Sequence, residues 1–236
     1  MNTFDVIVTW PINCDYPLWR QFIRDNRHRF NEIIIAFHNT NLNIDFRLFI
    51  ASSMFPDYVH FLDARTPKPD EDWRSVAINQ SLIHSYNSEW IWFTEQDFII
   101  DDPGFWDEVS ENSKKYDIMA VFQADRMHPC CIFIKRQLLQ KTSRNFGIIP
   151  NVADHFSIIQ REIEALQVPI YHLEKGYKHL NGLSHNISLL EQGQAPNYHL
   201  DDLKIWFEAC KKVKVPIDER FLLLERSIGI PYSTAK

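Results

Sequence analysis

The stretch Trp90-Ile91-Trp92-Phe93-Thr94-Glu95-Gln96-Asp97-Phe98 decides the fold of this chain. Its first four residues are apolar or aromatic without alternation, which predicts a strand buried on both faces. Two carboxylates, Glu95 and Asp97, follow with no turn-forming residue before them. Side chains alternate along an extended chain, so both carboxylates point the same way. Because like charges repel and α/β sheets bind ligands at such strand ends, the stretch predicts a divalent metal that receives a phosphate-bearing substrate.

The composition of the chain narrows the classes of protein to which it can belong. Its 236 residues suit one large domain, and 45% hydrophobic residues supply a core. A net charge of −6 argues against a protein that coats nucleic-acid phosphates. The six glycines form neither G-x-G-x-x-G nor a P-loop, which weakens dehydrogenase and ATPase interpretations. We see no signal peptide, no run of about 20 apolar residues and no C-x-x-C pair, so we expect a reducing, cytoplasmic location.

Apolar runs alternate with helical patterns along the chain. Four runs in the first half predict strands, at residues 5–10, 32–38, 58–62 and 90–93. Helical patterns lie between them, after Pro17 and over residues 73–86. The second half adds predicted strands at 118–122, 131–134 and 169–173, and helices at 156–166 and from 203 onward. Such alternation implies right-handed parallel crossovers, so we expect an α/β domain with a mostly parallel twisted sheet flanked by helices.

Two motifs of the chain resemble a known family. The helix segment Ala77-Ile78-Asn79-Gln80-Ser81-Leu82 leads into Glu89-Trp90-Ile91-Trp92-Phe93-Thr94-Glu95-Gln96-Asp97. Together they resemble the A-R-N-x-G and E-W-I-x-F-L-D-x-D motifs of the GT-A class of nucleotide-sugar glycosyltransferases, family-2 type. The resemblance implies a GT-A (Rossmann-like) fold in a single domain over residues 1–236. It assigns residues 1–125 to nucleotide-sugar binding, 126–200 to the acceptor side, and 201–236 to a C-terminal helix and tail.

The resemblance also implies an activity and a set of site residues. The activity is a metal-dependent, hexosyltransferase-like transfer from a nucleotide sugar, UDP-linked by expectation, with Mn²⁺ or Mg²⁺. Asn151-Val152-Ala153-Asp154 resembles the family's acidic motif, which makes Asp154 the base of an inverting reaction. Asp97, Glu95 and His185 would hold the metal, with His179 as the alternative histidine. Donor contacts would come from Thr9, Trp10, Pro11, Asn39, Arg74, Asn79, Glu95 and Gln96.

Departures from the family pattern keep other functions open. Ile78 replaces the family's arginine, although Arg74 one turn earlier could reach a phosphate, and Ala153 replaces an acid. A nucleotidyltransferase shares the sheet order, but the residues that follow the first strand, 9–13, contain neither glycine nor lysine. A non-catalytic binding module with this fold would tolerate both replacements. The acceptor also stays open, among glycan, lipid-linked sugar, protein and modified nucleic acid.

Acidic residues before helices have a structural interpretation as well. The pairs Asp101-Asp102 and Asp201-Asp202 each precede a predicted helix, so we interpret both as caps and assign neither to metal. Asp154 also precedes a helix. A cap and a base are compatible there, because a helix start favours an ionised carboxylate.

Overall fold

The computed structural model describes residues 3–11, 17–38, 58–64, 66–69, 71–85, 88–95, 97–149, 155–212 and 219–229. The chain forms two compact units, one made of residues 1–12 with 26–178 and the other of residues 13–25 with 179–236. Within the described ranges, no helix is both long enough and apolar enough to cross a membrane.

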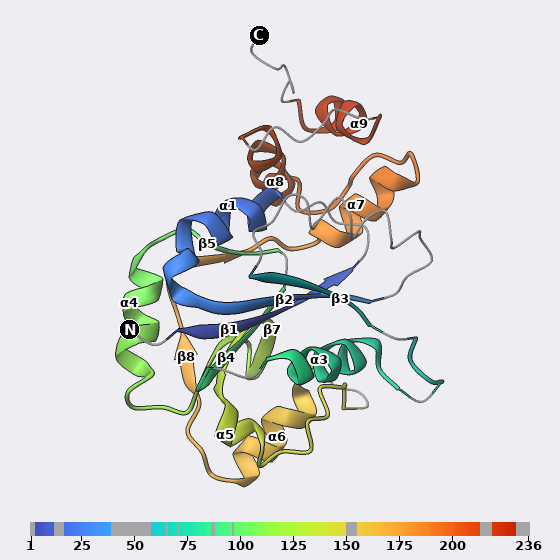
Figure 1. Cartoon of the computed structure of the whole chain (residues 1–236). Helices are drawn as coiled ribbons and strands as arrows, with labels where there is room; N and C mark the ends of the chain where they lie inside the picture. The colour runs from blue at the N-terminus through green and yellow to red at the C-terminus, as the bar shows by residue number, and fades with distance from the viewer. Residues whose placement is uncertain are drawn as a thin grey trace. The chain divides into compact units, whose positions relative to one another are not determined.

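A sheet of seven strands forms the centre of the described part of the first unit (Figure 1). The strands are β1 (Phe4–Pro11), β2 (Phe30–His38), β3 (Val59–Asp63), β4 (Trp90–Glu95), β6 (Ile118–Gln123), β7 (Arg126–Lys135) and β8 (Tyr171–Leu173). Their spatial order is β3-β2-β1-β4-β7-β6-β8. Neighbouring strands are parallel except at β7, which is antiparallel to both β4 and β6. The predicted fold class, a mostly parallel α/β sheet, is confirmed.

Helices pack on the sheet of the first unit. They are α3 (Trp73–His84), α4 (Gly104–Asn112), α5 (Arg136–Leu139) and α6 (Ser157–Ala165). A short 3₁₀ helix, η1 (Arg27–Arg29), precedes β2. A separate two-stranded sheet pairs β5 (Phe98–Ile100) with β9 (Tyr177–His179). The boundary between the two units falls inside β9, directly before His179.

The described part of the second unit is helical. Its helices are α1 (Pro17–Asn26), α7 (Leu183–Glu191), α8 (Leu200–Lys212) and α9 (Glu219–Ile228). Asn186 of α7 is fully buried, and its side-chain oxygen accepts hydrogen bonds from the backbone amides of Asn197 and Tyr198, both at 3.2 Å. This buried amide holds the segment that leads into α8.

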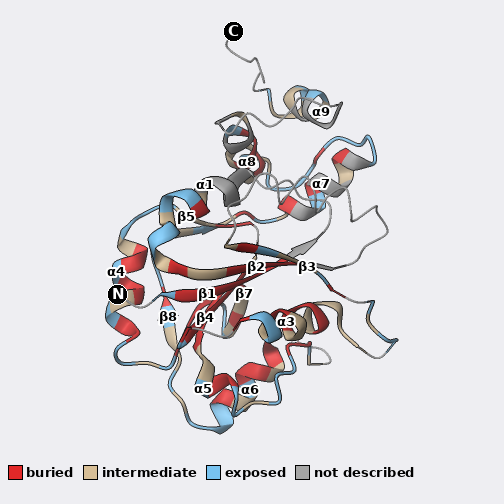
Figure 2. Ribbon diagram, viewed as in Figure 1, coloured by how far each residue is buried: buried red, intermediate tan, exposed pale blue. Residues whose placement is uncertain are grey.

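Strand β4 is buried because it contributes to a different core on each face (Figure 2). On one face the Trp92 ring stacks on Phe133 of β7, with centroids 5.2 Å apart and an interplanar angle of 2°. On the other face Phe93 packs against Phe146 at 5.5 Å and Phe156 at 5.3 Å, within an aliphatic and aromatic cluster that includes Ile78 of α3. A strand covered on both sides needs apolar residues at every position, which is why this run does not alternate.

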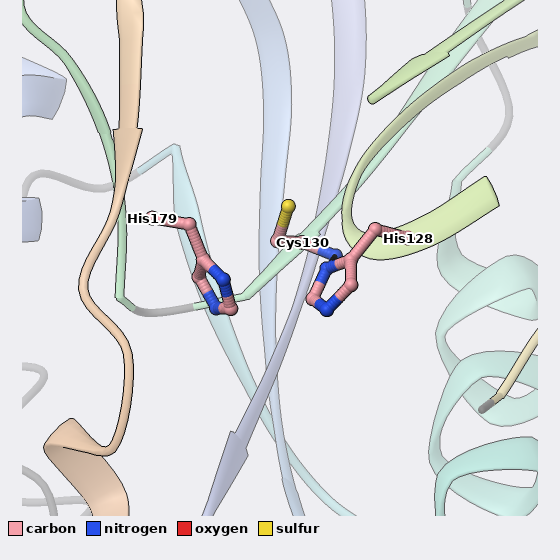
Figure 3. Close-up of side chains that lie close together, drawn as sticks. All are labelled: His128, Cys130 and His179. Carbon is pink, nitrogen blue, oxygen red and sulfur yellow. Dashed lines mark hydrogen bonds between the residues drawn. The ribbon is translucent and has the colours of Figure 1, made fainter. Parts of the chain in front are cut away.

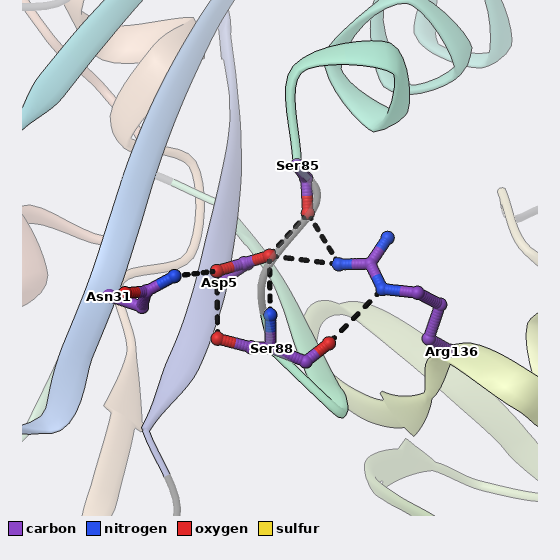
Figure 4. A network of polar contacts seen from close by, with 5 residues as sticks. All are labelled: Asp5, Asn31, Ser85, Ser88 and Arg136. Atoms are coloured by element: carbon purple, nitrogen blue, oxygen red, sulfur yellow. Dashed lines mark hydrogen bonds and ion pairs between the residues drawn. The ribbon is translucent and has the colours of Figure 1, made fainter.

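A polar network ties the amino ends of β1 and β2 to the start of β4 and to α5 (Figure 4). Asp5 is fully buried, and Arg136 Nη2 lies 2.8 Å from its Oδ2. The hydroxyls of Ser85 and Ser88 each donate to the Asp5 carboxylate at 2.8 Å, and Asn31 Nδ2 donates at 3.1 Å. Burying a carboxylate is unfavourable unless its oxygens are bonded, and here both are.

The predicted elements are confirmed with small shifts, including the three-residue strand β8, and several further elements were not predicted. The strands β5 and β9 have three residues each, too few to show a period, and α9 lies where a tail was expected. The cap prediction is confirmed at Asp102, whose Oδ1 accepts from the Gly104 amide at 2.6 Å. It is wrong for residues 201–202, which lie inside the first turn of α8, where acidic residues favour the helix dipole.

Candidate functional site

The carboxyl ends of β1 and β4 lie next to each other and carry polar residues. In the parallel register Thr9 of β1 is opposite Glu95 of β4. Thr9 is buried, and β1 continues through Trp10 and Pro11, whose side chains lie outside the described part of the structure. The structure therefore brings two predicted donor-binding residues, Thr9 and Glu95, to the edge where α/β sheets bind ligands.

Helix α3 supplies a cation to this edge. Asp72 begins the helix as its N-cap, with Oδ1 accepting from the Ser75 amide at 2.8 Å. Two residues after the cap, Arg74 Nη1 lies 2.7 Å from Glu95 Oε1, with 18% and 13% of the two side chains exposed. A partly buried, short ion pair of this kind is much less screened by solvent than a surface pair. Arg74 and Glu95, both predicted to contact the donor, are thus joined directly.

Asp97 lies in the turn between β4 and β5, with only 9% of its surface exposed. The partner of β5 is β9, which ends at His179. One ligand atom from each of Glu95, Asp97 and His179 lies within 4.8 Å of the others. Two carboxylates and one imidazole suit a divalent ion such as Mn²⁺. The pairing of β9 with β5 accounts for the place of His179.

A second set of ligand atoms shares His179. His128 and Cys130 of β7 form it together with His179, again within 4.8 Å, and the two imidazoles lie on either side of Cys130 (Figure 3). Nitrogen and sulfur ligands select softer ions such as Zn²⁺. Sequence analysis missed His128 and Cys130. Their spacing of two within a strand, which places both side chains on one face, is the feature that could have revealed them.

His155 is a further residue that sequence analysis missed. Its Nδ1 lies 3.4 Å from Asp72 Oδ1. Burial alone raises the pKa of Asp72, but the contact with His155 and the hydrogen bond from Ser75 outweigh it and lower the pKa from 3.8 to about 2. Asp72 is therefore an anion at neutral pH and faces an imidazole.

The residue after His155 has an unusual backbone. Phe156 has φ of +67°, a left-handed conformation that is unfavourable for a bulky side chain by roughly 1–3 kcal/mol. Its amide donates to the Phe146 carbonyl at 3.0 Å, and its buried ring packs between Phe93 and Phe146. The apolar contacts hold the strained residue in place.

Other predicted site residues lie elsewhere or outside the described ranges. Asn79 Nδ2 donates to the Arg144 carbonyl at 3.0 Å and lines a groove of about 480 Å³ between α3 and residues 143–148. His185 is exposed on α7, with its ring perpendicular to that of Tyr198. Among the described residues, His179 belongs to two sets of ligand atoms that lie close enough to share an ion, and His185 belongs to neither. Three predicted residues lie outside the described ranges: Asn39, Gln96 and Asp154.

No family model and no curated protein sequence matches the chain. Solved structures do match it. One is glucosyl-3-phosphoglycerate synthase of Mycobacterium tuberculosis in complex with Mn²⁺, UDP and glucosyl-3-phosphoglycerate, at a TM-score of 0.51 and 14% identity, covering 84% of this chain and 82% of that one. A mannosyltransferase of Pyrobaculum calidifontis in complex with GDP-Man and Mn²⁺ matches at 0.52 and 12%, covering 98% and 71%.

A third match has a different chemistry. The 4-diphosphocytidyl-2C-methyl-D-erythritol synthase of Anaerococcus prevotii gives a TM-score of 0.51 at 9% identity, covering 75% of this chain and 92% of that one. At such identities the likenesses show the fold alone. They confirm a GT-A-like fold, which glycosyltransferases and related nucleotidyltransferases share.

Proposed function

We propose that this protein is a metal-dependent glycosyltransferase that moves a sugar from a nucleotide-sugar donor, UDP-linked, to an acceptor hydroxyl. The proposal rests on the ligand atoms of Glu95, Asp97 and His179, which lie within 4.8 Å of one another at the carboxyl edge of a GT-A-like sheet. Two solved structures with this fold support it, because they are a synthase with Mn²⁺ and UDP and a mannosyltransferase with Mn²⁺ and GDP-Man. The acceptor class stays open, as in the sequence prediction.

We assign the metal to Asp97, Glu95 and His179. When bound there, a divalent cation would supply positive charge against the diphosphate that leaves the sugar. Sequence analysis left His179 and His185 as alternatives. We choose His179 because β9 brings it to the two carboxylates, whereas His185 is exposed on α7.

Arg74 is the protein's own cation in the proposed donor site. Its guanidinium already lies against Glu95, and its planar donors match the oxygens of a phosphate. A bound diphosphate would share Arg74 with Glu95, and the positive charge would favour the leaving group as it gains negative charge. Thr9, Trp10, Pro11, Asn39, Asn79 and Gln96 stay in the proposal as predicted donor contacts.

The proposed reaction is a direct displacement that inverts the anomeric carbon. The acceptor oxygen forms a bond to that carbon while the bond to the diphosphate breaks. A base must take the hydroxyl proton as the bond forms. The sequence predicts Asp154 for this role, and the residue directly after it, His155, contacts Asp72.

A nucleotidyltransferase is the second candidate function, because a synthase of the diphosphocytidyl type shares this fold. Such an enzyme would use a nucleoside triphosphate and release pyrophosphate. We rank it second because residues 9–13, at the carboxyl end of β1 and directly after it, contain neither glycine nor lysine to cradle a triphosphate. We also propose a cytoplasmic location, which suits the free thiols of Cys130 and Cys131.

One assay separates the candidates. The protein is incubated with Mn²⁺ and either UDP-glucose, GDP-mannose or a nucleoside triphosphate mixture, and the released nucleoside diphosphate and pyrophosphate are measured. We expect nucleoside diphosphate from a nucleotide sugar, with loss of release in Asp97→Asn and retention in the surface control Asp117→Asn. Pyrophosphate from a triphosphate would instead support the nucleotidyltransferase. Tight nucleotide-sugar binding without any release would support a binding module.

A further inference from the structure

Asp72 and His155 form a carboxylate–imidazole pair between segments that are far apart in the sequence. The Nδ1···Oδ1 distance is 3.4 Å, and both side chains are partly buried. A carboxylate beside Nδ1 favours the tautomer with its proton on Nδ1, which leaves Nε2 as a hydrogen-bond acceptor. This is the arrangement in which a histidine serves as a general base with a carboxylate as its orienting group.

The backbone directly after His155 has an unfavourable conformation. Phe156, the next residue, keeps its left-handed φ of +67° because its ring is locked between Phe93 and Phe146. Phe93 belongs to β4, two residues before Glu95. Strained residues of this kind persist where surrounding packing over-determines them, and they cluster at functional sites. Strand β4 therefore holds the backbone next to His155 through Phe93, and it also carries Glu95.

The first turn of α3 joins this pair to the proposed donor site. Asp72 faces His155, and Arg74, two residues later, faces Glu95. The cap residue of α3 therefore contacts His155, and the second residue of the helix contacts Glu95. The groove of about 480 Å³ along α3 is lined by Asp72 and Ser75, so it borders the carboxylate of the pair.

We infer that His155, oriented by Asp72, is the group that accepts the proton of the attacking hydroxyl. In this step the hydroxyl proton moves to Nε2 and the oxygen forms a bond to the anomeric carbon. The bond from that carbon to the diphosphate breaks, and its electron pair leaves with the phosphate oxygen. The imidazolium that results lies beside the Asp72 anion, which stabilises it. The inference rests on the proposed function and moves the base by one residue, from Asp154 to His155.

Hydrolysis of UDP-glucose and GDP-mannose with Mn²⁺ tests the inference, because water needs the same base as an acceptor hydroxyl. We expect His155→Gln to lower kcat by about 10²- to 10⁴-fold while the affinity for the nucleotide sugar changes by less than about twofold. His155→Ala should regain rate with added imidazole, which a structural role would not produce. Asp72→Asn keeps a side-chain acceptor for the helix cap, so it should lower kcat while the protein stays folded at the assay temperature.

The controls separate failure of the inference from failure of the proposed function. His60 and Glu32 form a similar pair, 2.6 Å apart on the strands, with His60 half exposed, so His60→Gln should hydrolyse at the wild-type rate. A wild-type protein that binds no nucleotide sugar refutes the proposed function. Near-wild-type turnover of His155→Gln, or loss of turnover in Asp154→Asn without loss in His155→Gln, overturns the inference.

A second measurement does not depend on turnover. The ¹⁵N chemical shifts of the His155 ring report which nitrogen carries the proton in the neutral imidazole. We expect protonated Nδ1 and unprotonated Nε2, with the preference lost in Asp72→Asn. A neutral ring protonated at Nε2 in the wild-type protein would refute the assignment, whatever the rates.

Discussion

At the scale of single residues, Arg74 supplies a positive charge to the carboxylates at the end of β4. Two carboxylates as close as Glu95 and Asp97 need a cation beside them, and Arg74 provides one to Glu95 at 2.7 Å. Helix α3 begins at the Asp72 cap, which places position 74 at the strand end and the family's arginine position, Ile78, in the apolar core. The first turn of α3 therefore brings a guanidinium to Glu95, while Ile78 is a core residue.

Asp72 predicts a pH dependence of stability at the same scale. The pKa of Asp72 in the folded protein is about 2, lowered from 3.8, so its ionised form is favoured by folding. That contribution is complete above about pH 4 and is lost as the pH falls toward 2. Thermal unfolding of the wild type and Asp72→Asn should therefore differ at pH 5, and the difference should shrink between pH 4 and pH 2.

An exposed aspartate provides the control for this experiment. The pKa of Asp201 is also lowered, by a hydrogen bond from Lys204, but this pair lies on the surface. Surface pairs contribute little to stability, so Asp201→Asn should leave the melting temperature almost unchanged at every pH. A difference between wild type and Asp72→Asn that is constant from pH 5 to pH 2 would contradict the assignment.

At the scale of elements, the strands of the seven-stranded sheet could be predicted and those of the two-stranded sheet could not. Trp90–Glu95 is apolar at nearly every position because both of its faces are covered, and such a run is visible in the sequence alone. The three-residue strands β5 and β9 exist only because they pair with each other across a long sequence separation. His179 could therefore be named as one of two candidate histidines, but its place beside Asp97 could not be derived.

The polar network at the amino ends of β1, β2 and β4 is the element-scale test of the fold. Asp5→Ala leaves Arg136 and two buried serine hydroxyls without their acceptor, so it should lower the free energy of unfolding by about 3–5 kcal/mol. Denaturant unfolding measures this. The ion pair between Lys135 and Asp117 is the control. Asp117 is 53% exposed, so Asp117→Ala should cost less than about 1 kcal/mol. Equal effects of the two variants would show that the network does not hold these elements together.

At the scale of the whole molecule, the sheet order accounts for where the candidate site lies. Parallel pairing of β1 with β4 sets Thr9 beside Glu95 at one edge, and parallel pairing is what the alternation of strands and helices in the sequence predicts. The residues that complete the site come from connections: Arg74 from the start of α3 and His155 from the start of α6. Contacts such as Asp72 with His155 depend on side-chain packing between distant segments, so periodicity in the sequence carries no information about them.

The central claim is that a divalent metal at Asp97 and Glu95 helps to bind the nucleotide of the donor. Calorimetry of UDP binding in Mn²⁺ and in EDTA tests it most directly, on the wild type, Asp97→Asn, His179→Ala and His185→Ala. We predict that Mn²⁺ raises the affinity of the wild type at least tenfold, that Asp97→Asn and His179→Ala lose most of this enhancement, and that His185→Ala keeps it. Wild-type affinity for UDP that is the same in Mn²⁺ and in EDTA would contradict the metal assignment.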